Sequence, residues 1–201
     1  MKRRQKFYLI IKRLIGIFGS LIGIVFCFSL VWWWVFIINL FVTKGHPFYS
    51  QKRIGKHKKV FKLLKFRSMK YGAPEIAPND LSVEEHDKLE TRFGRFLRVS
   101  SIDETLQLLN ILVGQMAFIG PRPGAAVNED YLIEEREKFT PNAYDVLPGL
   151  SGLAQVKMNR KHDPKEKAYY DHLYVEKISL WLDIKIFFIT VGKIFGRICG
   201  K

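Results

Sequence analysis

Acidic residues are missing from the first third of this 201-residue chain, because no Asp or Glu occurs before Glu75. The same stretch carries 16 of the 33 Lys and Arg residues, so the formal net charge of +14 comes from that end. A basic stretch of this kind indicates an anionic partner, either a lipid surface or a nucleic acid. No recognised nucleic-acid module is visible in the sequence, which makes the lipid surface the favoured partner.

Cysteine is also scarce, since the sequence holds only Cys27 and Cys199. Two cysteines cannot build a disulfide framework, so we expect a reducing compartment. The histidines, at positions 46, 57, 86, 162 and 172, show no metal-ligand spacing and predict no site. The length suits one ordinary domain and is too short for two sizeable domains together with a membrane bundle.

One long segment has no charge at all: residues 14–43, LIGIFGSLIGIVFCFSLVWWWVFIINLFVT. About 20 apolar residues let a helix cross the bilayer core, so this segment predicts a membrane helix. A cleaved signal peptide would have a shorter apolar run followed by small residues. We expect the chain to divide into a membrane-embedded segment, residues 1–43, and a following domain, residues 44–201.

Basic residues flank this segment on both sides, and cytoplasmic flanks collect Lys and Arg. We therefore expect the helix to enter and leave by the same face, as a re-entrant pair, with a tilted single-pass anchor as the alternative. The segment contains no proline to mark a bend. Ser29 could support a bend by bonding a backbone carbonyl, while Gly16, Gly19 and Gly23 would ease close approach.

The rest of the chain predicts short helices and strands, and hence an α-rich α+β fold. Residues 47–69 suggest two strands around a turn at 55–59, with a helix as the alternative for the second half. Residues 72–80 form a proline-containing loop, and the Gly- and Pro-rich segments FIGPRPG and PGLSGLAQV predict a rigid loop and a turn. Helical patterns begin at Ser82 and cover residues 101–112, 128–139 and 178–198.

The last of these helices, residues 178–198, has a broad apolar side that carries Trp181 and three Phe residues. Four of its five polar residues fall on one narrow face, with Lys185 as the exception. This pattern is typical of an amphipathic helix that lies in a membrane interface. An ordinary core helix is the alternative, because a wide apolar face also suits a core.

The tetrapeptide Ser101-Ile102-Asp103-Glu104 has two interpretations. It is a capping box, in which Ser101 caps the next helix and the two acids complement the helix dipole. Adjacent carboxylates at a helix start also suit phosphate chemistry, because an ionised carboxylate can attack phosphorus or hold a divalent metal. Arginines at 92, 95 and 98 recur every three residues upstream and could reach these carboxylates.

Arg122 lies between Pro121 and Pro123, which restrict the backbone on both sides of it. Such rigidity suits planar, bidentate recognition of a phosphate, although simple loop punctuation is the alternative. Lys65 and Arg67, in KFRSM, lie within the basic stretch and are weaker candidates that could serve only to meet lipid.

Taken together, KFRSM, TRFGRFLRVSSIDETLQLLNILVGQMAFIGPRP, PGLSGLAQV and YVEKISLWLDIKIFF resemble the bacterial monotopic phosphoglycosyl transferases, in their small, catalytic-domain-only form. The resemblance implies a re-entrant membrane helix, interfacial helices and an Asp-Glu dyad that acts with Mg²⁺. It also implies transfer of a sugar phosphate from a UDP-sugar to undecaprenyl phosphate, through a phosphosugar-aspartyl intermediate. The expected location is the cytoplasmic face of the bacterial inner membrane.

By this resemblance the nucleophile is Asp103 and its partner is Glu104, both of them candidate metal ligands. The phosphate-binding positions are Lys65, Arg98 and Arg122.

The sequence departs from the family pattern at three places. Thr105-Leu106 replaces Leu-Pro, which loosens the helix start. Gln115 and Ala117 replace Asp and Ser, which puts a supporting polar contact in doubt, and Leu30 replaces the proline after Ser29.

The sequence thus predicts a membrane-embedded transferase with an anionic bilayer and two phosphate substrates as partners, and without nucleic acid. Two readings from other classes stay open: a non-catalytic basic module that binds the membrane surface, and a nucleic-acid binder tethered to the membrane. The sugar is not identified, and an oligomer is possible.

Overall fold

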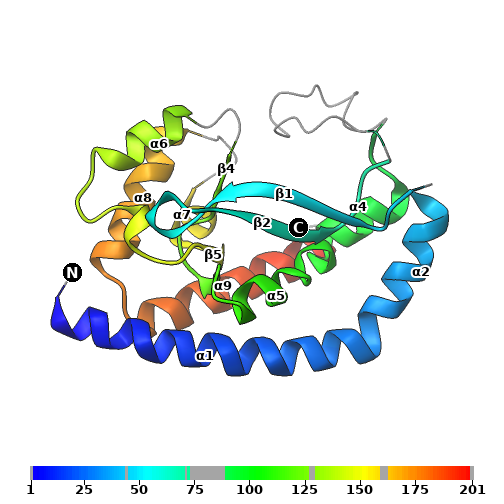
Figure 1. Ribbon diagram of the computed structural model, residues 1–201, viewed down its shortest axis with the longest axis horizontal. Coiled ribbons are helices and arrows are strands. Elements are labelled where there is room, and N and C mark those ends of the chain that lie inside the picture. Colours follow the sequence, from blue (N-terminus) through cyan, green and yellow to red (C-terminus); the bar gives the residue numbers. More distant parts are fainter. Residues whose placement is uncertain are drawn as a thin grey trace.

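The computed structural model describes residues 2–43, 45–70, 72, 89–126, 130–158 and 163–199. It is a helix-rich α+β fold with one long N-terminal helix, as predicted. Figure 1 shows this helix along one edge of the molecule, with the strands and the remaining helices on its inner side. The helices are α1 (Arg3–Cys27), η1 (Phe28–Trp32), α2 (Trp33–Val42), η2 (Lys56–Lys58), α4 (Arg92–Val99), η3 (Ile102–Glu104), α5 (Gln107–Leu112), α6 (Asp130–Glu137), η4 (Ala143–Asp145), α7 (Leu153–Lys157), α8 (Pro164–Glu176) and α9 (Leu180–Ile198).

The N-terminal helix is continuous from α1 through η1 to α2, and η1 is a π-helical segment. Figure 1 shows the helix turning between α1 and α2. The Ser29 hydroxyl donates to the carbonyls of Val25, at 2.7 Å, and Phe26, at 3.2 Å, as expected for a side chain that supports a bend. In the part of the chain that the structure describes, residues 3–42 are the one helix long and apolar enough to cross a membrane.

Glycines allow α1 to lie close to the rest of the fold. A Cβ atom at Gly19 would lie 2.8 Å from the Phe118 ring, and one at Gly23 would lie 3.1 Å from the Leu108 side chain. The outer side of α1 exposes large apolar residues such as Phe7, Ile22 and Val25. One face of this helix is therefore bound to the domain, and the other is free to contact lipid.

The strands form two small sheets. β1 (Phe48–Ile54) and β2 (Val60–Phe66) make the predicted hairpin, with Phe48 opposite Phe66 and Ile54 opposite Val60. The alternative of a helix over the second half is therefore wrong. β4 (Gly124–Ala125) adds to the free edge of β1, while β3 (Ala117–Ile119) and β5 (Gly149–Ser151) pair in parallel. The GPRP loop and the PGLSG segment consequently lie next to each other.

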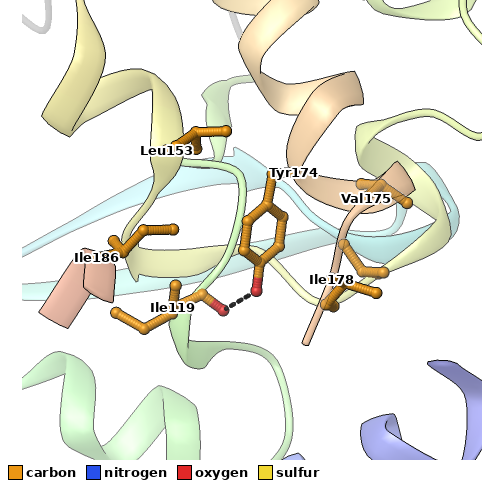
Figure 2. Packing of buried hydrophobic residues seen from close by; sticks show 7 residues of the cluster. Ile119, Leu153, Tyr174, Val175, Ile178 and Ile186 are labelled. Atoms are coloured by element: carbon orange, nitrogen blue, oxygen red, sulfur yellow. Dashed lines mark hydrogen bonds between the residues drawn. The ribbon is translucent and has the colours of Figure 1, made fainter. Parts of the chain in front are cut away.

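The largest apolar cluster lies where α8 and α9 meet β3 and α7. Figure 2 shows Tyr174 of α8 at its centre, among Ile119, Leu153 and Ile186, with its hydroxyl pointing at the Ile119 carbonyl. A second cluster joins Val35 of α2 to Phe66, Leu97 and Leu106. This second cluster packs the bent end of the N-terminal helix against the segments on either side of the Asp-Glu pair.

The helix predicted over 178–198 forms α9, and the orientation of its faces decides between the two interpretations. Its apolar side is exposed, with Trp181 75% and Phe188 67% accessible, so the core-helix alternative is wrong. The polar face points inward instead. It makes four sets of contacts: Asp183 with Tyr8, Lys12 and Tyr174; Thr190 with Ser151; Lys193 with the Gln155 carbonyl; and Arg197 with Ser101.

Three other predictions need correction. Residues 101–112 do not form one helix, because the short helix η3 precedes α5 and two turn residues separate them. The helix predicted from Ser82 is not continuous into α4, because Glu90 forms a β-bridge with Met69 and Thr91 has an extended backbone. The start of that predicted helix, within residues 73–88, lies outside the described residues. The PGLSGLAQV segment is not only a turn, since it forms β5 and α7.

The helix predicted over 128–139 is confirmed as α6, with residues 127–129 outside the described residues.

Candidate active site

Asp103 and Glu104 lie on the single 3₁₀ turn η3 between α4 and α5. The turn begins at Ser101, whose backbone is left-handed with φ of 59°, and its bonds run from Glu104 N–H to Ser101 and from Thr105 N–H to Ile102. Ser101 makes no capping bond, so the capping-box interpretation is wrong. Its hydroxyl instead accepts a 3.0 Å bond from Arg197 of α9.

Glu104 is held by two cations from distant parts of the sequence. Lys65, near the end of β2, donates to its Oε1 at 2.7 Å. Arg122, in the loop between β3 and β4, donates to Oε1 at 2.5 Å and to Oε2 at 3.4 Å. The structure therefore brings together Lys65, Glu104 and Arg122, three of the predicted site residues.

Asp103 differs from Glu104, although the two are adjacent. Its side chain is buried, with 5% of the residue exposed, and no described residue donates a hydrogen bond to its carboxylate. Burial raises the pKa of Asp103 to about 6, with Lys65 opposing the shift and Glu104 adding to it. At neutral pH this carboxylate is mostly ionised, and it is free to react or to bind a ligand.

The pKa of Glu104 moves the opposite way. Burial alone would raise it, but the charges and hydrogen bonds of Arg122 and Lys65 outweigh burial and hold the pKa well below its usual range. The two carboxylates thus have distinct roles open to them: Glu104 is a permanent anion that anchors cations, and Asp103 is a desolvated carboxylate with free oxygens.

Arg98 is the member of the arginine stripe whose charge acts on Asp103, where it lowers the pKa against the effect of burial. Its Nε donates to the Ser68 hydroxyl at 3.0 Å, and its Nη1 pairs with Glu90 at 3.4 Å. A Cβ at Gly94 would lie 1.8 Å from the Ser68 carbonyl, so only glycine allows α4 to approach the KFRSM segment this closely. Arg95, by contrast, is an exposed partner of Glu90.

The loop that carries Arg122 is packed between backbone segments. Gly120 N–H donates to Ser151 O at 2.8 Å, and Gly149 N–H donates to Pro121 O at 2.9 Å. A Cβ at Gly149 would lie 2.1 Å from the Gly120 nitrogen, so no side chain fits there. The Arg122 guanidinium also donates to the Leu150 carbonyl at 3.2 Å. The predicted rigidity of this loop therefore comes from the PGLSG segment as well as from its prolines.

Two of the departures from the family pattern are explained by contacts. Gln115 accepts a 2.6 Å bond from Asn110 of α5, whose side chain also bonds the β2 backbone at Lys62 and Leu64, so a polar contact exists at position 115. Thr105 accepts a 3.0 Å bond from the Trp32 indole of η1. This second bond ties the bend of the N-terminal helix to the turn that carries Asp103.

Magnesium fits one of the two carboxylates directly. Mg²⁺ prefers one or two carboxylates together with water and substrate phosphates. Asp103 offers oxygens to which no residue in the described ranges donates a hydrogen bond, whereas both oxygens of Glu104 are bound by Lys65 and Arg122. The described residues contain no cluster of three His, Cys, Asp or Glu side chains that could hold a metal alone. A metal held here would therefore depend on the substrate phosphates for its remaining ligands.

Several residues that shape the site were not predicted from the sequence. They are Ser68, which orients Arg98; Trp32, which bonds Thr105; and Arg136, which bonds the backbone of Arg122. Their contacts join residues 14 to 73 positions apart, so no local pattern could show them. The sequence placed Arg197 on the polar face of α9. It did not show that this face points inward, toward Ser101.

The bacterial sugar transferase family profile matches residues 7–197, which is nearly the whole chain. The chain belongs to the bacterial sugar transferase family. This family consists of phosphoglycosyl transferases, so the chain is related to enzymes that move sugar phosphates. Three of the motifs that show the resemblance, those that carry Lys65, Arg122 and Leu150, meet at the segment with Asp103 and Glu104.

Relatives with assigned activities agree with this assignment. The UDP-glucose:undecaprenyl-phosphate glucose-1-phosphate transferase of Xanthomonas campestris is 36% identical over 160 residues, which is 77% of this chain and 33% of that protein. The enzyme of the same name from Caulobacter vibrioides is 37% identical over 74% of this chain and 57% of that protein. The undecaprenyl-phosphate galactose phosphotransferase of Salmonella typhimurium is 32% identical over 76% of this chain and 34% of that protein. The chain therefore spans between a third and three fifths of the length of these relatives.

Proposed function

We propose that this protein transfers a sugar 1-phosphate from a UDP-sugar to undecaprenyl phosphate and releases UMP. The observation that supports this most is the Asp103 carboxylate, which is buried, mostly ionised and without a hydrogen bond from the described residues, beside a Glu104 that anchors Lys65 and Arg122. The names of the relatives supply the two substrate classes, because they include UDP-glucose and undecaprenyl phosphate.

In the first step an Asp103 oxygen attacks the β-phosphorus of the UDP-sugar. A carboxylate–phosphorus bond forms, and the bond from that phosphorus to the bridging oxygen breaks, so UMP leaves with the electron pair. In the second step an oxygen of undecaprenyl phosphate attacks the same phosphorus and the Asp103 carboxylate leaves. The products are undecaprenyl-diphosphate-sugar and the regenerated enzyme.

Both substrates are anions, so the site has to offset charge repulsion with fixed cations. Lys65 and Arg122 are held beside the carboxylates by Glu104 and have further N–H groups to donate to incoming phosphate oxygens, while Arg98 adds a third positive charge near Asp103. Asp103 is the side chain that would hold Mg²⁺. When bound, the ion supplies further charge neutralisation at the phosphates.

We further propose that the site works at the membrane surface, on the cytoplasmic side, with the N-terminal helix re-entrant. Helix α9 supports this placement, because it exposes an apolar face while its polar face contacts α1 near one end and Ser101, beside the dyad, near the other. The bend at η1 and the basic flanks on both sides of the helix agree with re-entry. The test introduces single cysteines at positions 5 and 46 of the chain and labels them in intact cells. We expect both to be labelled from the same side of the membrane, and labelling from opposite sides would exclude re-entry.

The decisive assay measures UMP release from a panel of UDP-sugars, with and without Mg²⁺ and undecaprenyl phosphate. We expect multiple-turnover release with at least one donor, dependent on both the metal and the lipid acceptor. Without the acceptor, release should stop at about one UMP per enzyme, because the covalent intermediate then accumulates. The chief competing interpretation is a non-catalytic module that binds anionic lipid through its basic end. That module would bind vesicles of phosphatidylglycerol but release UMP from no donor.

A further inference from the structure

The backbone of the Arg122 loop is fixed almost entirely through its carbonyl oxygens. Two of its residues are prolines, which have no N–H group to donate. Pro121 O accepts from Gly149 N–H at 2.9 Å, Arg122 O accepts from Arg136 at 2.9 Å, and Pro123 O accepts from Arg53 at 3.3 Å. The central bond, at Arg122 itself, is the only one of the three that comes from a fully buried charged side chain.

Arg136 lies on α6, and only 2% of it is exposed. Its Nε and Nη2 donate to one oxygen of Asp171 on α8, at 3.0 and 2.5 Å, and Nη2 also reaches Arg122 O. Its guanidinium lies over the Tyr144 ring, 5.5 Å from the ring centre. These contacts fix the guanidinium on three sides, so its bond to the Arg122 carbonyl has little freedom to move.

The buried ion pair between Arg136 and Asp171 is a poor way to stabilise the fold. Both residues are almost completely buried, and taking two charges out of water often costs more than their attraction returns. The other Asp171 oxygen, Oδ1, has no hydrogen-bond partner among the described residues, which adds a further cost. The contact that a pair of apolar side chains could not provide is the bond to Arg122 O.

We propose that Arg136, held by Asp171, is a positioning residue that sets the Arg122 guanidinium against Glu104 and the substrate phosphates. This inference rests on the proposed function. Arg136 is too far inside the fold to bind substrate itself, so its effect passes through Arg122. A shift of the Arg122 backbone would move the bidentate contact with Glu104, and errors of about 1 Å in such contacts cost roughly 100-fold in rate.

The test replaces the ion pair by apolar residues in one variant, Arg136→Met with Asp171→Leu. Buried ion pairs exchanged for apolar residues of similar volume are often neutral or stabilising, so the thermal midpoint should change little. We expect kcat for UMP release to fall about 10- to 100-fold, while KM for the best UDP-sugar of the panel changes by less than about threefold. Glu137→Ala is the matched control, because it breaks an exposed pair between the last residue of α6 and Lys58 and should leave both constants unchanged.

A double-mutant cycle with Arg122→Ala separates positioning from a general structural role. If Arg136 acts through Arg122, the apolar pair should lower kcat by less than about twofold once Arg122 is gone. A full additional loss in that background, or unchanged kcat in the Arg122 protein, would overturn the proposal. If the apolar pair does not fold, Arg136→Lys takes its place in the same cycle, since a lysine keeps the charge for Asp171 but lacks the planar guanidinium that donates through both Nε and Nη2. A wild-type protein that releases UMP from no donor would instead refute the proposed function.

Discussion

The Asp103 carboxylate should cost folding stability at neutral pH, and Asp103→Asn tests that cost. Asn has the same size as Asp and resembles its protonated form, so the variant removes the charge and keeps the shape. The native pKa is about 6 and the ordinary value is 3.8. A difference of about two units corresponds to roughly 3 kcal/mol at pH 7, against the folded state. The variant should therefore be more stable than the wild type.

The sign follows from which state binds the proton more tightly. The folded protein holds the Asp103 proton more tightly than the unfolded chain, so this group favours folding at low pH, and the advantage is lost as pH rises through about 6. Asp103→Asn should raise the thermal midpoint by roughly 6 to 12 °C at pH 7, for a chain of this length. At pH 4 its gain should shrink to about 0.5 kcal/mol, because the wild-type carboxyl is then protonated when folded.

The assay is thermal unfolding in detergent, followed by tryptophan fluorescence at pH 4 and pH 7, with EDTA present and no substrate. Asp130→Asn, at the exposed start of α6, is the control and should shift the midpoint by only a degree or two at either pH. The variant should also be inactive. An Asp103→Asn protein that is no more stable than the wild type at pH 7, or whose gain is the same at both values, would refute the account of a desolvated carboxylate.

Three further predictions concern the surroundings of the site. Gly149→Ala should destabilise the fold by about 3 kcal/mol or more, because its Cβ would lie 2.1 Å from the Gly120 nitrogen; a normal thermal midpoint would contradict this packing. Thr105→Val should cost about 2 kcal/mol, because it removes the bond from Trp32 and the hydroxyl's own bond to the Ile102 carbonyl, and in a Trp32→Phe background only the share of the Ile102 bond, about 1 kcal/mol, should remain. Phe188→Ser on α9 should weaken binding to phosphatidylglycerol vesicles by about tenfold with an unchanged thermal midpoint, whereas lower stability with unchanged binding would favour a buried role.

The sequence predicts most of the local structure, because its signals there are local. Alternating side chains around Gly55 predict the hairpin, and thirty uncharged residues predict the membrane helix. The residue pattern marked Asp103, Glu104, Arg122 and, more weakly, Lys65 as candidates, and the resemblance to a known family assigned their roles and that of Arg98. The fold brings all five to one place. Their clustering supports the assigned roles without testing them.

The features that could not be predicted from the sequence depend on contacts between residues far apart in the chain. The pattern S-x-x-E predicts a cap at Ser101, but the hydroxyl bonds Arg197 and the residue adopts a left-handed backbone, so the turn is 3₁₀ rather than α-helical. Arg136 looks like one more charge on a polar helix, and only its contacts with Asp171 and Arg122 show that it is buried. The inward direction of the polar face on α9 is likewise set by partners far away in the sequence.

The central claim is that Asp103 becomes covalently attached to a sugar phosphate, and trapping that species tests it most directly. The wild-type protein would be mixed with its best UDP-sugar and Mg²⁺ in the absence of lipid acceptor, quenched in acid within one turnover, and analysed as intact protein and as peptides. We predict added mass equal to one phosphosugar, on the peptide that contains Asp103, which disappears when undecaprenyl phosphate is added. An active preparation that carries no such adduct, or an Asp103→Asn variant that still releases UMP at the wild-type rate, would contradict the account.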